Sequence, residues 1–244
     1  MTNEVAFRIS LKLVAVLSAF LFVVASNPVI GKSPQAKGIE DRRSTLQDVP
    51  DESRRLVWSL TTDGLSVDKT RLNGPERIFI ALPGWQWVDL PKACPPGLAL
   101  GRQGEAIVTS NILPMIWRID PVTLSVTVHA IKLNADRTKD LGFSAIVYSP
   151  RERAYFAMSD VHGSLWKIDE KLLIGEKVNL SDALPKACSL MIAVDASRRP
   201  SHTGAFCLVG EKKSWTITVA RNGRSASVRE DPCRDASYIV ESAK

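Results

Sequence analysis

The chain has 244 residues, of which 45% are hydrophobic, so it is long enough to bury one core of single-domain size. Its net charge is +6 at pH 7, but the basic residues stand singly or in pairs such as Lys212-Lys213 rather than in blocks. No basic helix is flanked by aromatic residues either. These features argue against a nucleic-acid partner.

The N-terminus has the pattern of a secretory signal peptide. Arg8 and Lys12 precede an uncharged stretch over residues 13–24 that is rich in Leu, Val, Ala and Phe, and the small residues Ala25 and Ser26 follow it. A basic start, a short apolar core and a small-residue exit are typical of cleaved export signals. We therefore expect a signal peptide over residues 1–26 and a secreted or periplasmic protein.

A second interpretation of this segment is an uncleaved membrane anchor. The uncharged run continues to Ile30 and reaches about 18 residues, which is the lower limit for crossing a bilayer. Residues 27–53 then combine low hydrophobicity with dense mixed charge, which predicts a flexible linker because such a composition cannot bury a core. The folded domain is expected to cover residues 54–240, with no later membrane span.

An aromatic segment, Pro83-Gly84-Trp85-Gln86-Trp87, opens this domain and is flanked by turn-forming residues. Trp85 and Trp87 could form an exposed pair that stacks on a ligand such as a sugar. The alternative is that both rings pack the first part of the domain against its neighbour.

Three tryptophans, Trp117, Trp166 and Trp215, follow at equal steps of 49 residues. The first two lie in nearly the same phrase, Ile-Trp-Arg-Ile-Asp and Leu-Trp-Lys-Ile-Asp, which ends at Asp120 and Asp169. A fixed period of this length is a sign of a repeat architecture. Each period contains four short segments of alternating apolar and polar residues with turn signals between them, which is the content of one β-propeller blade.

The sequence therefore predicts an all-β, propeller-like fold with three clear four-stranded blades. Part of a fourth blade is expected in residues 56–60 and 77–82, although Trp58 lies 59 residues before Trp117 and breaks the period. A closed propeller needs at least four blades. Three interpretations remain open: a four-bladed ring, an incomplete ring that a partner subunit completes, and a fragment of a longer ancestor.

Residues 90–231 resemble blades of the six-bladed NHL- or SMP-30-like propeller superfamily. The resemblance rests on the segments Ala154–Asp169 and Ile107–Asp120. It implies that Trp117, Trp166 and Trp215 pack between blades. It also implies that Asp120 and Asp169 begin the turn between the third and fourth strands of their blades.

The same resemblance raises one catalytic hypothesis. SMP-30-like lactonases hold a divalent metal over the central channel with Glu, Asn and Asp side chains, and Asn111 and Asp160 lie in loops where such ligands would stand, with Glu105 nearby. Oxygen ligands of this kind suit calcium. The segment Asp160–Gly163 also contains His162. The other interpretation gives all these residues structural roles in turns.

The four cysteines are an even number in a chain expected in an oxidising compartment, so two disulfides are plausible. Cys188 and Cys207 are expected on neighbouring strands of one repeat, and this pair is the favoured one; buried free thiols are the alternative. The segment Leu-Pro-Lys-Ala-Cys also occurs twice, ending at Cys94 and at Cys188.

Two functions follow from these observations. The first is an exported, non-catalytic propeller-like protein that binds a protein or a small molecule through loops at Trp85, Trp87, Asn111, Asp160 and His162. The second is a metal-dependent, lactonase-like hydrolase. No Gly-x-Ser-x-Gly segment or phosphate-binding loop is present, so no catalytic residue is assigned. No cofactor is evident beyond the calcium that the resemblance implies.

Overall fold

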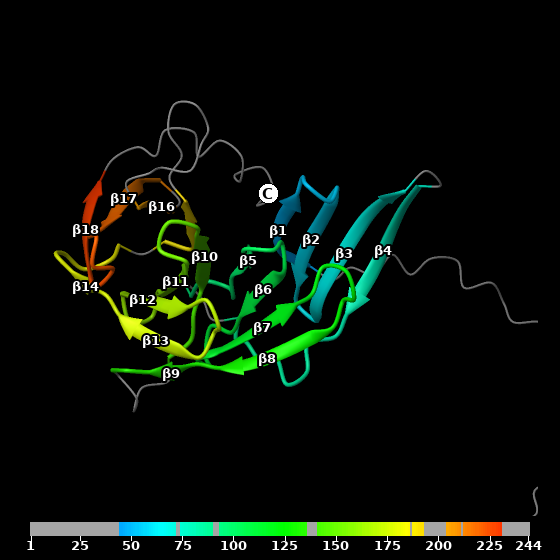
Figure 1. Ribbon diagram of the computed structural model, residues 1–244, viewed down its shortest axis with the longest axis horizontal. Coiled ribbons are helices and arrows are strands. Elements are labelled where there is room, and N and C mark those ends of the chain that lie inside the picture. Colours follow the sequence, from blue (N-terminus) through cyan, green and yellow to red (C-terminus); the bar gives the residue numbers. More distant parts are fainter. Residues whose placement is uncertain are drawn as a thin grey trace, which may run out of the picture. The chain divides into compact units, whose positions relative to one another are not determined.

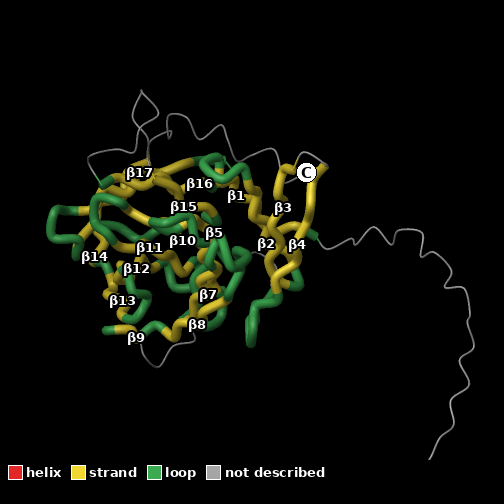
Figure 2. The backbone as a smooth tube through the Cα atoms, turned by 45° about the vertical axis from the view of Figure 1, so that its right-hand side comes forward, coloured by secondary structure: helices red, strands yellow, loops and turns green. Residues whose placement is uncertain are grey.

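Alternating apolar and polar residues produce strands along the whole described part of the chain. The computed structural model describes residues 44–71, 74–89, 93–135, 141–185, 187–192, 204–210 and 212–230. Every helix or strand assigned in these ranges is a β-strand, and the strands form four sheets in chain order (Figures 1 and 2). The all-β, blade-repeat prediction is confirmed. The expected signal peptide lies outside the described residues.

Sheets 1 and 2 are four-stranded antiparallel meanders. Sheet 1 contains β1 (Thr45–Asp51), β2 (Leu56–Thr61), β3 (Gly64–Arg71) and β4 (Gly74–Ile80). Sheet 2 contains β5 (Leu98–Leu100), β6 (Ala106–Thr109), β7 (Met115–Ile119) and β8 (Val126–Ala130).

Sheets 3 and 4 repeat the meander and each add a fifth, parallel strand at the outer edge. Sheet 3 contains β10 (Ala145–Ser149), β11 (Ala154–Ser159), β12 (Ser164–Asp169), β13 (Ile174–Lys177) and the added β9 (Lys132–Leu133). Sheet 4 contains β15 (Ser189–Ile192), β16 (Ala205–Val209), β17 (Ser214–Val219), β18 (Ser225–Glu230) and the added β14 (Asn179–Leu180).

The sheets stand beside one another like propeller blades. All four belong to one compact unit, residues 42–244. The first strands of successive sheets are in contact, β1 with β5, β5 with β10 and β10 with β15 (Figure 1). Each sheet therefore packs face to face on the next, with its first strand inside and its later strands progressively farther out. Within the described ranges, no helical segment has the length and hydropathy of a membrane span.

The core is divided into three apolar clusters, one between each pair of neighbouring sheets. Trp117 and Trp166 are fully buried and belong to the clusters on the side of the preceding sheet, whereas Trp215 is partly buried against the third cluster. All three lie in the third strand of their sheets. The 49-residue period therefore marks one equivalent position in three blades.

The structure corrects the extent of the first blade. Residues Thr45–Asp51, expected in the linker, form β1, so the folded domain begins before residue 54 and its first blade is complete. Trp58 breaks the tryptophan period because it lies in the second strand of its sheet, opposite Val67 of β3. In sheet 2 the order is reversed, with Val108 in the second strand and Trp117 in the third.

The expected Cys188–Cys207 disulfide is wrong. Cys188 is bonded to Cys94, with a Cα–Cα distance of 5.1 Å. Cys207 pairs with Met191 in the ladder between β15 and β16. Met191 lies three residues after Cys188 in the chain, so Cys207 is too far from Cys188 for a disulfide. Cys207 is itself disulfide-bonded, and Cys233 lies outside the described residues.

Candidate ligand-binding site

The loops of sheets 1–3 lie at two opposite ends, because consecutive strands of each meander are antiparallel. One end, which we call the connector end, carries the segments between sheets and the loops between second and third strands: among the described residues, 62–63, 81–89, 93–97, 110–114, 141–144 and 160–163. The other, the hairpin end, carries the remaining turns: residues 52–55, 101–105, 120–125, 150–153 and 170–173. All the ligand-binding residues expected from the sequence belong to the connector end.

At the connector end, Asn111 and Asp160 hold the backbone around Cys94. The Asn111 amide nitrogen donates to the carbonyl oxygens of Val88 (2.8 Å) and Cys94 (3.1 Å), and its oxygen accepts from the Val88 N–H (3.0 Å). Asp160 Oδ2 accepts from the Cys94 N–H (3.0 Å). The structure thus brings these two residues together, but as supports for a loop.

These contacts do not fit a calcium site. The side-chain oxygen of Asn111 and one carboxylate oxygen of Asp160 already accept backbone N–H groups, so neither side chain directs a free set of oxygens at a common point. Across the described residues, no group of three or more His, Cys, Asp or Glu side chains is arranged to hold a metal ion.

Trp85 and Trp87 form a stacked pair, with ring centroids 6.2 Å apart and planes inclined by 29°. Their indole N–H groups donate to the carbonyl oxygens of Thr109 (2.9 Å) and Thr62 (3.1 Å). Both rings are half-buried, and Trp85 packs against the cluster between sheets 1 and 2. His162, also half-buried, lies in the turn between β11 and β12, away from this tryptophan segment in the chain.

A polar hollow of about 420 Å³ lies at the hairpin end. Its walls come from the first turn of sheet 1, the first turn of sheet 2 and the strands β7 and β8. The charged and polar side chains of these walls include Arg54, Glu105, Arg118, Asp120 and Thr127. Sequence reasoning did not predict this site, although it noted Glu105.

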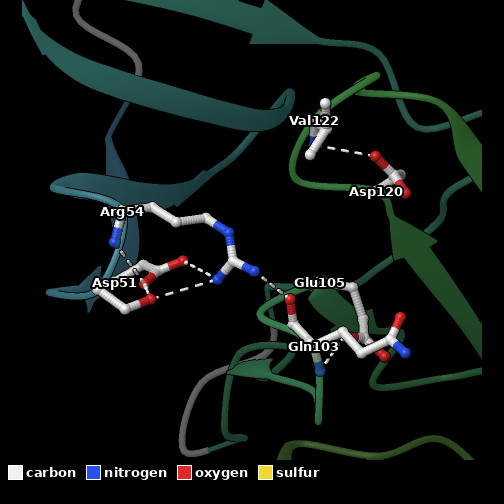
Figure 3. Close-up of polar contacts among 7 residues, drawn as sticks. Asp51, Arg54, Gln103, Glu105, Asp120 and Val122 are labelled. Atoms are coloured by element: carbon white, nitrogen blue, oxygen red, sulfur yellow. Dashed lines mark hydrogen bonds and ion pairs between the residues drawn. The ribbon is translucent and has the colours of Figure 1, made fainter.

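Arg54 is fixed across the gap between sheets 1 and 2 (Figure 3). Its guanidinium donates to Asp51 Oδ2 (3.0 Å) and to the Gln103 carbonyl oxygen (2.5 Å). Burial raises the pKa of Asp51, but hydrogen bonds from Ser53 and Arg54 outweigh it, so that the pKa lies below its ordinary value. The ion pair therefore neutralises Arg54, which acts as a brace for the wall of the hollow.

Arg118 differs from Arg54 in its partners, because the nearby carboxylate of Asp120 interacts with it only through its charge, without a direct ion pair. It is half-buried in the middle of β7, and among the described residues no hydrogen bond or ion pair engages its guanidinium. The neighbouring Asp120 uses Oδ1 to accept from the N–H group of Val122 (2.9 Å; Figure 3) and from that of Thr123 (2.7 Å) in its own turn. The guanidinium of Arg118 thus faces the hollow with its N–H groups available to bind an anion.

The equivalent residue of the next blade provides a contrast. Lys167 occupies the position of Arg118 in the repeated phrase, and its ammonium group pairs with Glu152 Oε2 at 3.3 Å. Asp169, the counterpart of Asp120, accepts from the N–H groups of Leu173 and Ile174 at the turn into β13. Both aspartates accept N–H groups of their own turn, although at different positions, and of the two cations only Lys167 has an ion-pair partner among the described residues.

Glu105 is a further polar residue of the wall, and it contacts Tyr155, which is buried in the core between sheets 2 and 3 and does not line the hollow. Glu105 Oε2 accepts from the Gln103 N–H (2.7 Å), and its other oxygen lies 3.5 Å from the Tyr155 hydroxyl. Burial, followed by the charge of Glu105, raises the pKa of Tyr155 well above its ordinary range. The phenol therefore stays protonated at neutral pH and serves as a hydrogen-bond donor rather than as a base.

A second polar network stands beside this wall. Glu170 accepts from the Tyr148 hydroxyl (2.8 Å), from Arg102 (3.2 Å) and from Arg153 (3.2 Å). The bond from Tyr148 lowers the pKa of Glu170 most, so it remains ionised at neutral pH. The rings of Tyr148 and Tyr155 are in tilted contact, with centroids 5.1 Å apart.

One signal in the sequence could have identified Arg118. It is a charged residue in the middle of a strand whose other members are apolar, and such residues lie on a packed face only when a partner or a cavity accommodates them. Whether the charged residue has a partner or faces a cavity depends on the first turn of its own sheet. That turn contains Gln103 in sheet 2 and Glu152 in sheet 3. The sequence alone does not show that these two turns are equivalent.

Comparisons with known proteins support the fold. No family model matches the chain, and no curated protein matches it. Among solved structures, it is similar to virginiamycin B lyase from Staphylococcus aureus in complex with quinupristin. That match has 13% identity and a TM-score of 0.53, and it covers 82% of this chain and 59% of the lyase.

A similar match is an auxiliary nutrient binding protein from Bacteroides ovatus, with 12% identity, a TM-score of 0.53 and coverage of 76% of this chain and 46% of that one. Hydrazine synthase from Kuenenia stuttgartiensis matches at 9% identity with a TM-score of 0.50, covering 82% of this chain and 53% of that one. The chain thus spans about half the length of these structures. At such identities they indicate a β-propeller-type fold and do not extend to the NHL or SMP-30 family.

Proposed function

We propose that this chain is an exported, non-catalytic propeller-type protein that binds a small molecule with an anionic group in the hairpin-end hollow. The observation that carries the proposal is the guanidinium of Arg118, which lines the hollow without a partner among the described residues, whereas its counterpart Lys167 is paired. Asp120 and Glu105 line the same hollow, and the charge of Asp120 acts on Arg118 without a direct ion pair. A bound carboxylate or phosphate would supply the charge-assisted hydrogen bonds that the guanidinium lacks.

The size and lining of the hollow agree with this ligand. A hollow of about 420 Å³ lies within the range of small-molecule sites. Arg54 is fixed by Asp51, and Thr127 is exposed, so the wall supplies donors beside Arg118. A small carboxylate that also carries hydroxyl groups would match this arrangement.

Export is supported by the disulfide between Cys94 and Cys188, because structural disulfides persist in oxidising compartments. The lactonase-like alternative is less well supported. Its metal would depend on Asn111 and Asp160, whose oxygens accept backbone N–H groups, and on Glu105, which belongs to the opposite end of sheet 2.

Calorimetric titration of the purified protein tests the proposal, with citrate, succinate, gluconate and inorganic phosphate as probes and glucose as the uncharged control. At least one anion should bind, and Arg118→Gln should weaken it by roughly 10- to 150-fold, as expected for a hydrogen bond to a charged group. Lys167→Gln, the matched change in the next blade, should leave the affinity unaltered.

Two results would overturn the proposal. One is binding that Arg118→Gln and Lys167→Gln weaken equally, because the hollow would then have no special part in it. The other is hydrolysis of a sugar lactone by the protein in the presence of calcium, with loss of turnover in Asp160→Asn, which would support the enzymatic alternative.

A further inference from the structure

The outer edges of sheets 3 and 4 are covered in the same unusual way. In each sheet a two-residue strand from the segment after the preceding sheet pairs in parallel with the outermost strand, β9 with β13 and β14 with β18 (Figure 1). We call these two short strands the edge strands. They are a repeated module that the 49-residue tryptophan period does not reveal.

Three hydrogen bonds hold the edge strand of sheet 3. The N–H groups of Lys132 and Asn134 donate to the carbonyl oxygens of Leu173 (2.8 Å) and Gly175 (3.0 Å). The Lys177 N–H in turn donates to the side-chain oxygen of Asn134 (2.9 Å). The edge strand therefore satisfies two carbonyl groups and one N–H group that would otherwise face solvent.

Sheet 4 repeats these bonds with different residues. The N–H groups of Asn179 and Ser181 donate to the carbonyl oxygens of Arg224 (2.8 Å) and Ala226 (3.0 Å). The Val228 N–H donates to the hydroxyl oxygen of Ser181 (3.4 Å). The outer edges of sheets 3 and 4 thus make the same three hydrogen bonds at the same spacing, which indicates that they select edge strands with shared sequence features.

The two edge strands share a sequence pattern. Residues 131–134 read Ile-Lys-Leu-Asn and residues 178–181 read Val-Asn-Leu-Ser, so both follow the order β-branched, polar, Leu, polar. The β-branched residues Ile131 and Val178 are buried, and the two leucines are buried or half-buried. The polar second and fourth residues donate their N–H groups, and the fourth also supplies a side-chain oxygen.

Sheet 2 offers the same edge on β8. The hairpin bond from the Asp120 N–H to the Ser125 carbonyl oxygen (3.0 Å) corresponds to the bond from Ala220 to Ser225 (2.9 Å) in sheet 4. Because hydrogen-bonded and non-bonded pairs alternate in an antiparallel ladder, every second residue of β8 directs its N–H and C=O groups away from β7.

The outward groups of β8 are those that the other two sheets use. By this register, the carbonyl oxygen of Val126 and the N–H of Val128 correspond to those of Ala226 and Val228. Leu124 stands at the position of Arg224 but has a φ of 58°, whereas in sheets 3 and 4 the positive φ lies one residue earlier, so its carbonyl group is not counted. Within the described part of the chain β8 pairs with β7 alone, and Val128 is 38% exposed. The edge therefore offers two of the three main-chain groups that the other sheets use, and it has no edge strand among those residues.

The chain itself diverts the segment that would have filled this place. Residues after β4 correspond to those that form the edge strands after β8 and β13, but here Pro83-Gly84 forms a tight turn, closed by the Trp85 N–H donating to the Leu82 carbonyl (3.1 Å). Gly84 has a φ of 66°, in the left-handed region that glycine tolerates. The chain then continues into the tryptophan pair.

We propose that the β8 edge is a docking site for an extended peptide of a partner protein, which pairs in parallel and carries the order β-branched, polar, Leu, polar. The chemistry of the occupant is taken from the two edge strands already present in this chain. Binding by strand addition uses main-chain bonds for affinity and alternate side chains for selectivity. The site adjoins the hollow, because Ser125 and Thr127 of the hollow alternate along the chain with Val126 and Val128, whose side chains face the opposite side of sheet 2 from Arg118.

A peptide with the sequence of residues 130–135, Ala-Ile-Lys-Leu-Asn-Ala, is the probe, capped at both ends and labelled for fluorescence anisotropy. The full-length protein should bind it, and the peptide N-methylated at Lys and Asn should not bind, because both main-chain donors are lost. Val128→Pro removes one outward N–H without breaking a bond to β7, and it should abolish binding. Val128→Ala keeps the N–H and should retain binding.

Amide hydrogen exchange at Val128 shows whether the edge is open in the protein alone and whether the peptide covers it. In the protein alone the Val128 amide should exchange quickly, and saturating peptide should slow it by about tenfold or more. A Val128 amide already protected in the protein alone would mean that another part of this chain or a second copy covers the edge. That result would overturn the proposal, as would the absence of peptide binding up to about 1 mM.

Discussion

Cys94 and Cys188, which end the two copies of the segment Leu-Pro-Lys-Ala-Cys, are bonded to each other across a sequence separation of 94 residues. Cys94 precedes the first strand of sheet 2, and Cys188 precedes the first strand of sheet 4. The disulfide therefore links two equivalent connectors and closes a loop of chain that contains sheets 2 and 3. The backbone of Cys94 is held in addition by Asn111 and Asp160.

Removing this disulfide should lower the free energy of unfolding substantially. A cross-link that closes a loop of this length restricts the unfolded chain, and we expect Cys94→Ala/Cys188→Ala to lose about 2–4 kcal/mol. Urea unfolding followed by tryptophan fluorescence measures the change. A loss of less than about 0.5 kcal/mol would mean that the connectors are held by their hydrogen bonds without help from the disulfide.

Asn111→Asp distinguishes the loop-support role of this residue from a metal-ligand role. The change removes the amide that donates to Val88 and Cys94 and places a carboxylate beside their carbonyl oxygens, so stability should fall by about 2–4 kcal/mol. A calcium ligand would instead bind the metal more tightly as Asp. Thermal unfolding with and without calcium measures both, and stabilisation of the variant by calcium would contradict our assignment.

The tryptophans of the period should differ in their contributions. Trp166 is fully buried between sheets 2 and 3 and its indole N–H donates to Ser164 Oγ (3.0 Å), so Trp166→Ala should cost about 3–5 kcal/mol. Trp215 is only partly buried, and Trp215→Ala should cost clearly less. Denaturant unfolding of the two variants compares them, and equal losses would argue against the difference in burial.

His129 should report on the charge of Arg118. Burial, followed by the positive charge of Arg118, lowers the pKa of His129, while the carboxylate of Asp169 raises it to a smaller extent. Arg118→Gln should therefore raise the pKa of His129 in an NMR titration, and an anion bound at Arg118 should act in the same direction. A pKa that falls in the variant would contradict this arrangement.

The same shift predicts how stability depends on pH. The folded-state pKa of His129 lies below its unfolded value of about 6.5, so the unfolded chain takes up the proton first. The contribution of His129 is present above about pH 6.5 and is lost as the pH falls toward the folded-state pKa. Compared with His129→Gln, the natural protein should lose more stability between about pH 7 and pH 5.

The fold was largely predictable because strand alternation and the tryptophan period are local properties. The turns at Asp120 and Asp169 and the third-strand positions of Trp117, Trp166 and Trp215 follow from residues within a few positions of each other. The first blade was harder to recognise. Its tryptophan, Trp58, fills the same kind of interface from the second strand, and the charges near β1 resemble those of a linker.

The candidate sites depended on contacts between distant segments. Whether Arg118 has a partner is decided by the first turn of its sheet, and whether β8 has an edge strand is decided by the Pro83-Gly84 turn more than 40 residues earlier in the chain. Neither relationship has a fixed spacing in the sequence.

The sequence by itself determined the repeating unit, because side chains alternate along a strand and one large aromatic per blade marks the packed face. Only the tertiary structure decided which cysteines meet, that Asn111 and Asp160 support the Cys94 loop, and that the guanidinium of Arg118 faces a hollow without a direct partner among the described residues. The physical reason is that a blade forms from neighbouring residues, whereas its loops acquire partners from other blades.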